Sequence, residues 1–160
     1  MNDPISQGRV ALLHPKFRQA AEDFINDIEA ATGLTFRIVQ GLRTFAEQDA
    51  IYAEGRTVKG PNVRPGHPLG DTVTKSPAGA SYHNYGLAID IVPLIGGKPE
   101  WKYDFLSLKP HADKYGITMG YFFPARDADH FENKYGHNWR DLLDLHEKKN
   151  FIPGTTFVNI

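Results

Sequence analysis

Apolar side chains recur at helical spacing in two parts of the chain. From residue 15 to residue 32 they return every three or four positions with charged residues between them, which predicts an amphipathic helix packed on a core. Pro15 suits the first turn of this helix, where its missing N–H costs nothing, and Gly33 suits its end. The same period predicts a closing helix over residues 138–149.

Other segments have the composition of strands. Residues 34–40 alternate in polarity, and residues 87–92 form an apolar run that we expect to end at Pro93. Residues 117–123 predict a third strand. Between these runs, Gly96 begins a Gly-Gly turn, so the pattern favours short strands joined by tight connections.

Two shorter helices and a long loop complete the pattern. Thr44 and Glu47 have the spacing of a capping box and predict the start of a short helix. A weaker helix over residues 105–115 contains Pro110, which marks a kink or a break. Residues 55–79 are rich in proline and glycine, so we expect a long loop there, and loops of that length are usually functional.

Together these segments predict an α+β fold, a small antiparallel sheet packed against helices. A length of 160 residues with 41% hydrophobic content suits a single domain over 1–160, with its core over about 13–150. The net charge is −1, from 18 basic and 19 acidic residues, so we expect no nucleic-acid partner. No apolar stretch is long enough to span a membrane, and no signal peptide pattern opens the chain.

The candidate chemistry begins with an acid inside an apolar run. Asp90 interrupts residues 87–92, and a buried carboxylate costs several kcal/mol unless it is paired or bound to a cation. His83 precedes it across Gly86, which lets the chain turn back. The chain has seven histidines and no cysteine, so a metal would need imidazole and carboxylate ligands. If His130 completes such a set, a fourth position stays open, as in catalytic zinc sites.

Such a metal would need a base beside it. Bound zinc lowers the pKa of water from about 15.7 towards 7, and a carboxylate must then accept the proton. Asp127 has an i to i+3 relation to His130, and Asp129 is its competitor for this role. Spacing alone favours a hydrogen-bonded structural role for His83, and an arginine or backbone N–H as the partner of Asp90, over metal ligation.

Two motifs together resemble a known signature. They are Ser81-x-His83-x-x-Gly86-x-Ala88-x-Asp90 and Asp127-x-x-His130. The pattern resembles that of the zinc D-Ala-D-Ala carboxypeptidase and L-alanyl-D-glutamate peptidase superfamily. Residues 41–57 and 114–117 resemble its phage-endolysin branch, the L-alanyl-D-glutamate endopeptidases, and the whole resemblance spans about residues 15–136.

The resemblance implies a hedgehog/D-Ala-D-Ala peptidase-like fold and a role for each matching residue. The implied zinc ligands are His83, Asp90 and His130. Asp127 matches the general base and acid, and Arg43 matches the arginine that steadies the scissile carbonyl and its oxyanion. Ser81 matches a position that lines the substrate cleft, although its hydroxyl suits a loop cap equally well.

The implied activity is zinc-dependent hydrolysis of the L-Ala–D-Glu bond in the peptidoglycan stem, by a monomer whose partner is bacterial peptidoglycan. The alternatives are a D,D-carboxypeptidase or dipeptidase of the same superfamily, or a non-catalytic wall-binding domain on the same scaffold. We expect a stand-alone catalytic domain without a separate wall-binding domain. An endolysin-like role in bacteriophage lysis, and so an antimicrobial one, would keep the protein in the host cytoplasm until the membrane is breached. A tail-associated enzyme and a bacterial autolysin are the other options.

Several residues fall outside this core pattern. The loop over residues 57–80 is longer than is usual in the branch, and Met119 stands where relatives often place tryptophan. Glu132 either orients a ligand imidazole or is exposed. His67 is expected to be a solvated loop residue. The histidines expected at the surface are His14, His111, His137 and His146.

Overall fold

The computed structural model describes residues 1–160. The α-helices are α1 (Pro4–Ala11), α2 (Pro15–Thr32), α3 (Phe45–Ala53), α4 (Lys109–Lys114) and α5 (Trp139–Glu147). The strands are β1 (Thr35–Gln40), β2 (Ala88–Ile95), β3 (Lys98–Pro99), β4 (Thr118–Met119) and β5 (His130–Glu132). Three short 3-10 helices are η1 (Tyr82–Tyr85), η2 (Phe105–Leu108) and η3 (Gly120–Phe122).

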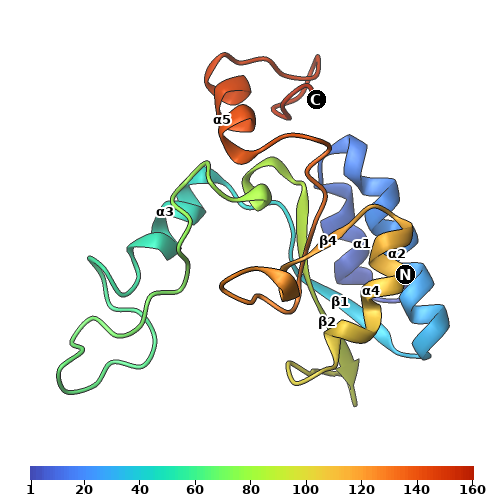
Figure 1. Ribbon diagram of the computed structural model, residues 1–160, viewed down its shortest axis with the longest axis horizontal. Helices are drawn as coiled ribbons and strands as arrows, with labels where there is room; N and C mark the ends of the chain where they lie inside the picture. The colour runs from blue at the N-terminus through green and yellow to red at the C-terminus, as the bar shows by residue number, and fades with distance from the viewer.

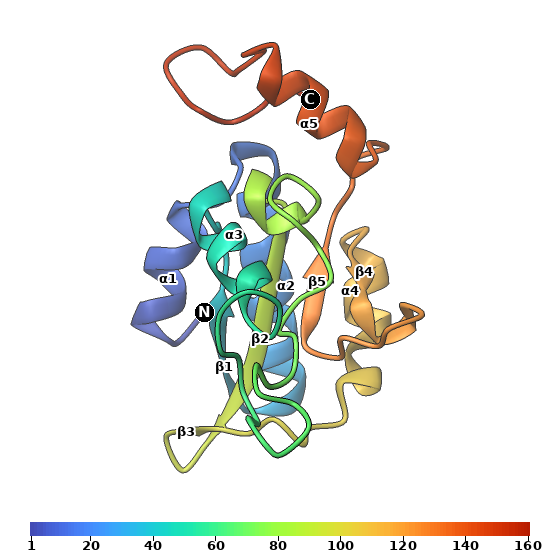
Figure 2. The ribbon, with the colours of Figure 1, turned by 90° about the vertical axis from the view of Figure 1, so that its left-hand side faces the viewer.

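The strands form one antiparallel sheet in the order β1-β2-β5-β4, and β3 extends it by pairing with the C-terminal end of β2. Helices α1, α2 and α4 gather on one side of the sheet, and β2 runs through the middle of the molecule (Figures 1 and 2). This arrangement confirms the expected α+β fold with a small antiparallel sheet. No helix has the length and apolar character needed to cross a bilayer.

Helix α2 supplies one wall of the hydrophobic core. It begins at Pro15 and ends at Gly33, which adopts the left-handed conformation and donates its N–H to the carbonyl of Glu29, as the sequence predicts. Its apolar face is completely buried, and the Phe24 ring packs on Phe131 of β5 with 5.1 Å between centroids. The helix therefore supports the strand that carries His130.

Two sequence expectations about element ends are wrong, and a third is confirmed. Strand β2 continues through Pro93 to Ile95, because the Pro93 carbonyl faces β3 and accepts from Glu100, so the missing N–H removes no bond to β1. The helix expected over residues 105–115 is divided into η2 and α4, as the kink or break expected at Pro110 indicated, and Pro110 lies in the first turn of α4. The expected strand over 117–123 stops at Met119, where the chain turns into η3.

Tertiary contact explains this last turn. A Cβ on Gly120 would meet the carbonyl oxygen of Asp127 at 2.5 Å and the Cβ of His130 at 2.9 Å. Only glycine lets these backbones approach so closely. The end of β4 is thus fitted against the segment that leads into β5.

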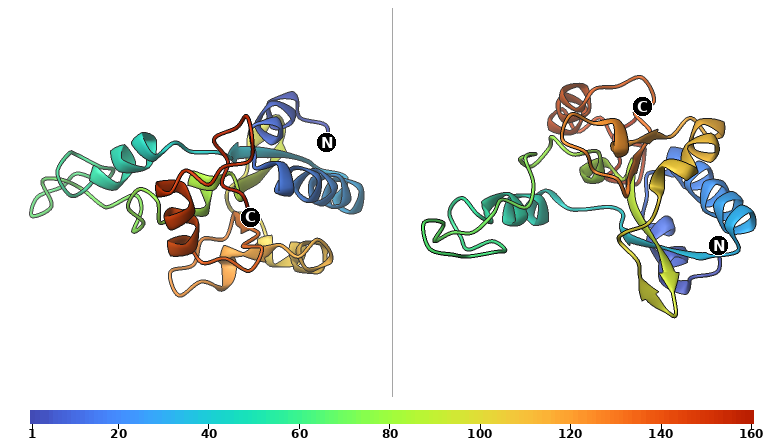
Figure 3. Two further views of the ribbon diagram at one scale, coloured as in Figure 1. Left: turned by 90° about the horizontal axis from the view of Figure 1, so that it is seen from above. Right: turned by 60° about the horizontal axis from the view of Figure 1, so that its bottom comes forward.

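Residues 55–79 form the expected long loop. With α3 they project away from the sheet as an arm (Figures 1 and 3). The arm is shaped by tight backbone packing, since a Cβ on Gly70, whose φ is 73°, would meet the Pro61 carbonyl oxygen at 2.1 Å. Its final residues run back to the sheet and form one wall of a cleft.

Helix α1 was not anticipated from the sequence, and its N-cap ties it to the sheet. The buried Asp3 carboxylate accepts from the Ser6 N–H at 3.0 Å and from Arg37 Nη2 of β1 at 2.8 Å. The hydrogen bond from Arg37, opposed by burial and helped by Ser6, lowers the pKa of Asp3. One side chain thus caps a helix and holds it to the sheet.

We expect Asp3→Ala to lower the free energy of unfolding by about 1–2 kcal/mol at pH 7, through the lost cap and the unpaired Ser6 and Arg37. Because the folded pKa is depressed, this contribution is complete above the unfolded pKa of about 3.9 and is lost as the pH falls through the lower folded value. Urea unfolding at pH 7 and pH 3 should show the gap between wild type and variant narrowing in acid. The exposed Asp144→Ala should shift neither curve, and an equal gap at both pH values would contradict the assignment.

Candidate metal centre and its cleft

Three side chains from three elements meet at one point. His83 lies on η1, while Asp90 of β2 and His130 of β5 are direct partners in the antiparallel register. The turn that brings η1 to the sheet needs Gly86, whose φ is 68° and whose Cβ would lie 2.6 Å from the His14 nitrogen. The local sequence therefore returns His83 to the strand that carries Asp90, as expected.

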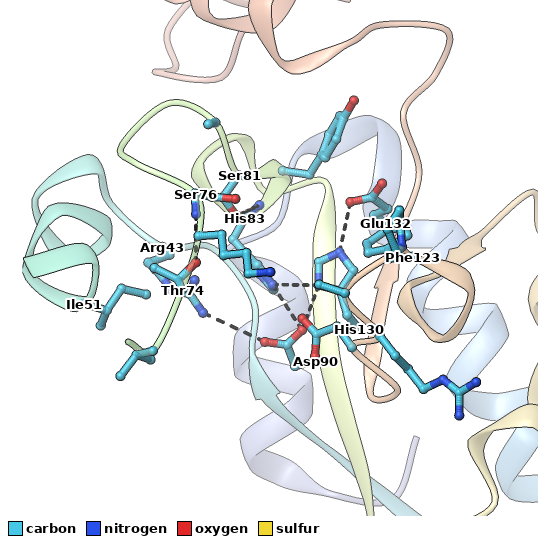
Figure 4. A pocket seen from close by; sticks show the side chains of 18 of the residues that line it. Arg43, Ile51, Thr74, Ser76, Ser81, His83, Asp90, Phe123, His130 and Glu132 are labelled. Atoms are coloured by element: carbon cyan, nitrogen blue, oxygen red, sulfur yellow. Dashed lines mark hydrogen bonds and ion pairs between the residues drawn. The ribbon is translucent and has the colours of Figure 1, made fainter. Parts of the chain in front are cut away.

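The ligand atoms of these residues form a nearly equilateral triangle (Figure 4). His83 Nε2 lies 3.1 Å from Asp90 Oδ1 and 3.2 Å from His130 Nδ1, and His130 Nδ1 lies 3.0 Å from Asp90 Oδ1. Around a tetrahedral zinc with bonds of roughly 2.0–2.1 Å, neighbouring ligand atoms are separated by about 3.3 Å. The triangle therefore has nearly the size that a zinc ion requires.

The outer nitrogens of both imidazoles face acceptors. His83 Nδ1 donates to the Gly41 carbonyl at 2.8 Å, and His130 Nε2 donates to Glu132 Oε2 at 2.9 Å. With their protons on the outer side, both rings turn lone pairs inward, beside the Asp90 carboxylate. Three acceptors that converge in this way need a cation between them, so the donor set fits a divalent metal.

In the absence of a metal, protonated imidazole offsets the negative charge of the carboxylates in this site. Burial lowers the pKa of His130, but hydrogen bonds to Asp90 and Glu132 outweigh it and raise the pKa to about 10. Burial raises the pKa of Asp90, yet the adjacent imidazoles hold it well below its usual range. The alternative partner considered for Asp90, an arginine, is also present, since Arg43 Nη2 lies 3.9 Å from Asp90 Oδ2.

Arg43 is directed toward the site by a buried glutamine. Arg43 Nη1 donates to Gln48 Oε1 at 3.1 Å, and Gln48 Nε2 donates to the Ser76 carbonyl at 2.7 Å. Gln48 is completely buried and was missed in the sequence. Its signal was the i to i+3 spacing from Phe45, which puts it on the inward face of α3.

The candidate metal centre lies in an open cleft of about 880 Å³. Residues 72–76 and 80–83 form one wall, residues 123–127 form the other, and Asp90 and His130 lie between them. The sequence offered two positions for Ser81, in the lining of the cleft or as a loop cap, and the structure shows both. Ser81 lines the cleft, and its Oγ caps η1 by accepting from the His83 N–H at 3.3 Å. His67 is exposed and does not line the cleft.

The two candidate bases occupy different environments. Asp127 is exposed on the cleft wall, whereas Asp129 is half-buried, does not line the cleft, and accepts the Ile91 N–H through its backbone carbonyl. Burial, with the charge of Asp90, raises the pKa of Asp129 to about 6. The cleft therefore presents Asp127, and not Asp129, to a molecule bound there.

One expected surface histidine is a core residue. His14 is completely buried because the C-terminal tail covers it, and its Nε2 donates to the Val158 carbonyl at 2.8 Å. Its Nδ1 accepts from the Lys16 N–H and caps α2. His111 is half-buried and lies 2.8 Å from an Asp27 oxygen.

Comparison with known proteins finds a relative that matches about half of this chain. Peptidoglycan L-alanyl-D-glutamate endopeptidase CwlK of Bacillus subtilis (strain 168) is 44% identical over 78 residues, which are 49% of this chain and 40% of that protein. The match thus spans about two fifths of the relative's length.

Solved structures share the fold at low sequence identity. The Serratia marcescens L-Ala D-Glu endopeptidase ChiX superposes with a TM-score of 0.57 at 18% identity, over 86% of this chain and 90% of the other. The vancomycin-resistance D,D-pentapeptidase VanY in complex with Zn(II) gives 0.55 at 16% identity, over 82% and 83% of the two chains.

The family comparison covers most of the chain. The VanY family, described as D-alanyl-D-alanine carboxypeptidase, matches residues 10–139, a stretch that includes every residue of the candidate metal centre and both cleft walls. The chain therefore belongs to the VanY family, within the superfamily of D-Ala-D-Ala carboxypeptidases and L-alanyl-D-glutamate endopeptidases.

Proposed function

We propose that the protein is a zinc peptidase that hydrolyses the L-Ala–D-Glu bond of the peptidoglycan stem. The observation that carries the proposal is the convergence of two imidazole lone pairs and one carboxylate at the base of an open cleft. The choice of bond is supported by the 44% identity to CwlK over 78 residues, and membership of a peptidase family supports the reaction class.

The side chains have complementary roles in this mechanism. His83, Asp90 and His130 would hold zinc, which when bound polarises a carbonyl and lowers the pKa of water. Asp127 accepts the proton of the attacking water and passes it to the leaving amine as the C–N bond breaks. Arg43, held by Gln48, donates to the carbonyl oxygen as negative charge develops there. The Ser81 hydroxyl can bond the peptide from the cleft wall.

Digestion of purified cell wall tests this assignment against its rival. A D,D-carboxypeptidase releases free D-Ala, whereas the proposed endopeptidase exposes new N-terminal D-Glu on the stem peptide. We expect N-terminal D-Glu, measured by end-group labelling and mass spectrometry of the digest. Release of D-Ala without new D-Glu termini would support the family's described carboxypeptidase activity instead. Binding to the wall without any cleavage, even with added zinc, would indicate a non-catalytic domain.

An endolysin-like role in cell-wall lysis follows from the same chemistry. We infer that a single catalytic domain over 1–160 carries it, with bacterial peptidoglycan as the partner. Support comes from the position of the cleft, which is open to a polymeric substrate between two loop walls. Purified protein should then clear a turbid suspension of isolated cell walls without a second protein.

A further inference from the structure

Glu132 is an acid buried beside the candidate metal centre. It lies two positions after His130 on β5, so both side chains project from the same face of the sheet. Its exposed fraction is only 3%. An acid removed from water in this way costs several kcal/mol unless it is paired, so its partners reveal what the site requires of it.

Each oxygen of Glu132 has a partner. Oε2 accepts from His130 Nε2 at 2.9 Å, and Oε1 lies 3.3 Å from Lys134 Nζ (Figure 4 shows the bond to His130). The Lys134 ammonium lies over the rings of Tyr82 at 5.5 Å and Phe123 at 5.9 Å. The carboxylate is thus held between a cation at the cleft wall and the back of a candidate metal ligand.

We propose that Glu132 is a positioning residue for the metal. It keeps the proton of His130 on Nε2, so that Nδ1 presents its lone pair to the point where His83 Nε2 and Asp90 Oδ1 meet. Without an acceptor behind the ring, the proton can occupy Nδ1 and compete with the metal. The inference rests on the proposed zinc site, and it assigns a role to a residue that is not among the three whose ligand atoms converge.

Zinc titration against a competing chromogenic chelator tests the proposal. Loss of such a carboxylate typically weakens metal binding by about 10–100-fold, and we expect Glu132→Ala to fall in this range. Glu132→Gln should bind much more like wild type, because its amide oxygen still accepts from His130 Nε2. The matched control is Asp144→Ala, which removes an acid from an exposed carboxylate–lysine pair on α5 and should leave zinc affinity unchanged.

The melting temperature of each metal-free variant separates positioning from simple packing. A packing role predicts lower melting temperatures with unchanged zinc affinity, and that result would overturn the inference. If Glu132→Ala does not fold, Glu132→Asp withdraws the carboxylate from His130 by one methylene and should weaken zinc binding; unchanged affinity would overturn the inference. Failure of the wild type to bind zinc would instead refute the proposed function, whereas tight binding by wild type and Glu132→Ala alike would refute only the role of Glu132.

Discussion

Replacing His83 with alanine is expected to abolish zinc binding and, with it, cleavage of cell wall. His83 supplies one of only three ligand atoms, and its ring is fixed by the bond from Nδ1 to the Gly41 carbonyl. Removal of a residue that only hydrogen-bonds a metal ligand typically weakens metal binding by roughly 10–100-fold. The loss in zinc affinity on removal of the ligand His83 should be larger. Metal analysis of the purified protein and release of wall peptides measure the two effects.

Zinc should also cease to stabilise this variant. A ligand that binds only the folded state at about 1,000 times its Kd stabilises a protein by about 4.1 kcal/mol, so wild type should melt at a higher temperature when zinc is added. His83→Ala should show no such rise. The matched control is His67→Ala, which removes an exposed imidazole that does not line the cleft. A zinc-dependent rise that persists in His83→Ala, or disappears in His67→Ala, would contradict the ligand assignment.

The convergence of His83, Asp90 and His130 could be predicted in part, because a buried acid is costly and its signal is local in the sequence. An acid within the apolar run of β2 needs a cation or a charged partner, and His83 precedes it across a turn that requires Gly86. The pairing of Asp90 with His130 depended on the sheet register, which spacing alone does not determine. The resemblance of the two motifs supplied that missing link.

Features set by distant contacts could not be predicted. The burial of His14 depends on the tail at Val158, which lies at the other end of the chain. The end of β4 depends on the approach of Asp127 and His130 to Gly120. Helix α1 is short, yet the Asp3–Pro4 pair was an available signal for its start. The spacing of hydrophobic residues identified long elements such as α2. The ends of the elements, and the contacts between polar side chains, are instead determined by tertiary packing.

Replacing Asp127 with asparagine should abolish cleavage while zinc binding stays intact. Asp127 lies on the cleft wall but is not among the three residues whose ligand atoms converge, so the metal does not depend on it. Asparagine keeps the size of the side chain and cannot take up a proton at neutral pH. A general base contributes about 10²–10⁴-fold, and kcat for wall peptides should fall by that factor with an unchanged Kd for zinc.

Asp129→Asn distinguishes the two acids. Asp129 does not line the cleft, and its raised pKa, about 6, arises from burial beside Asp90, so its removal should leave most of the activity. If Asp129→Asn were the inactive variant and Asp127→Asn retained near-normal kcat, the base would have to act from behind the cleft wall. If both variants lost activity with zinc still bound, the two carboxylates would share the proton, since the charge of each raises the cost of ionising the other. The kcat values of Asp127→Asn and Asp129→Asn, compared with zinc at full occupancy, therefore decide which oxygen receives the proton of the attacking water.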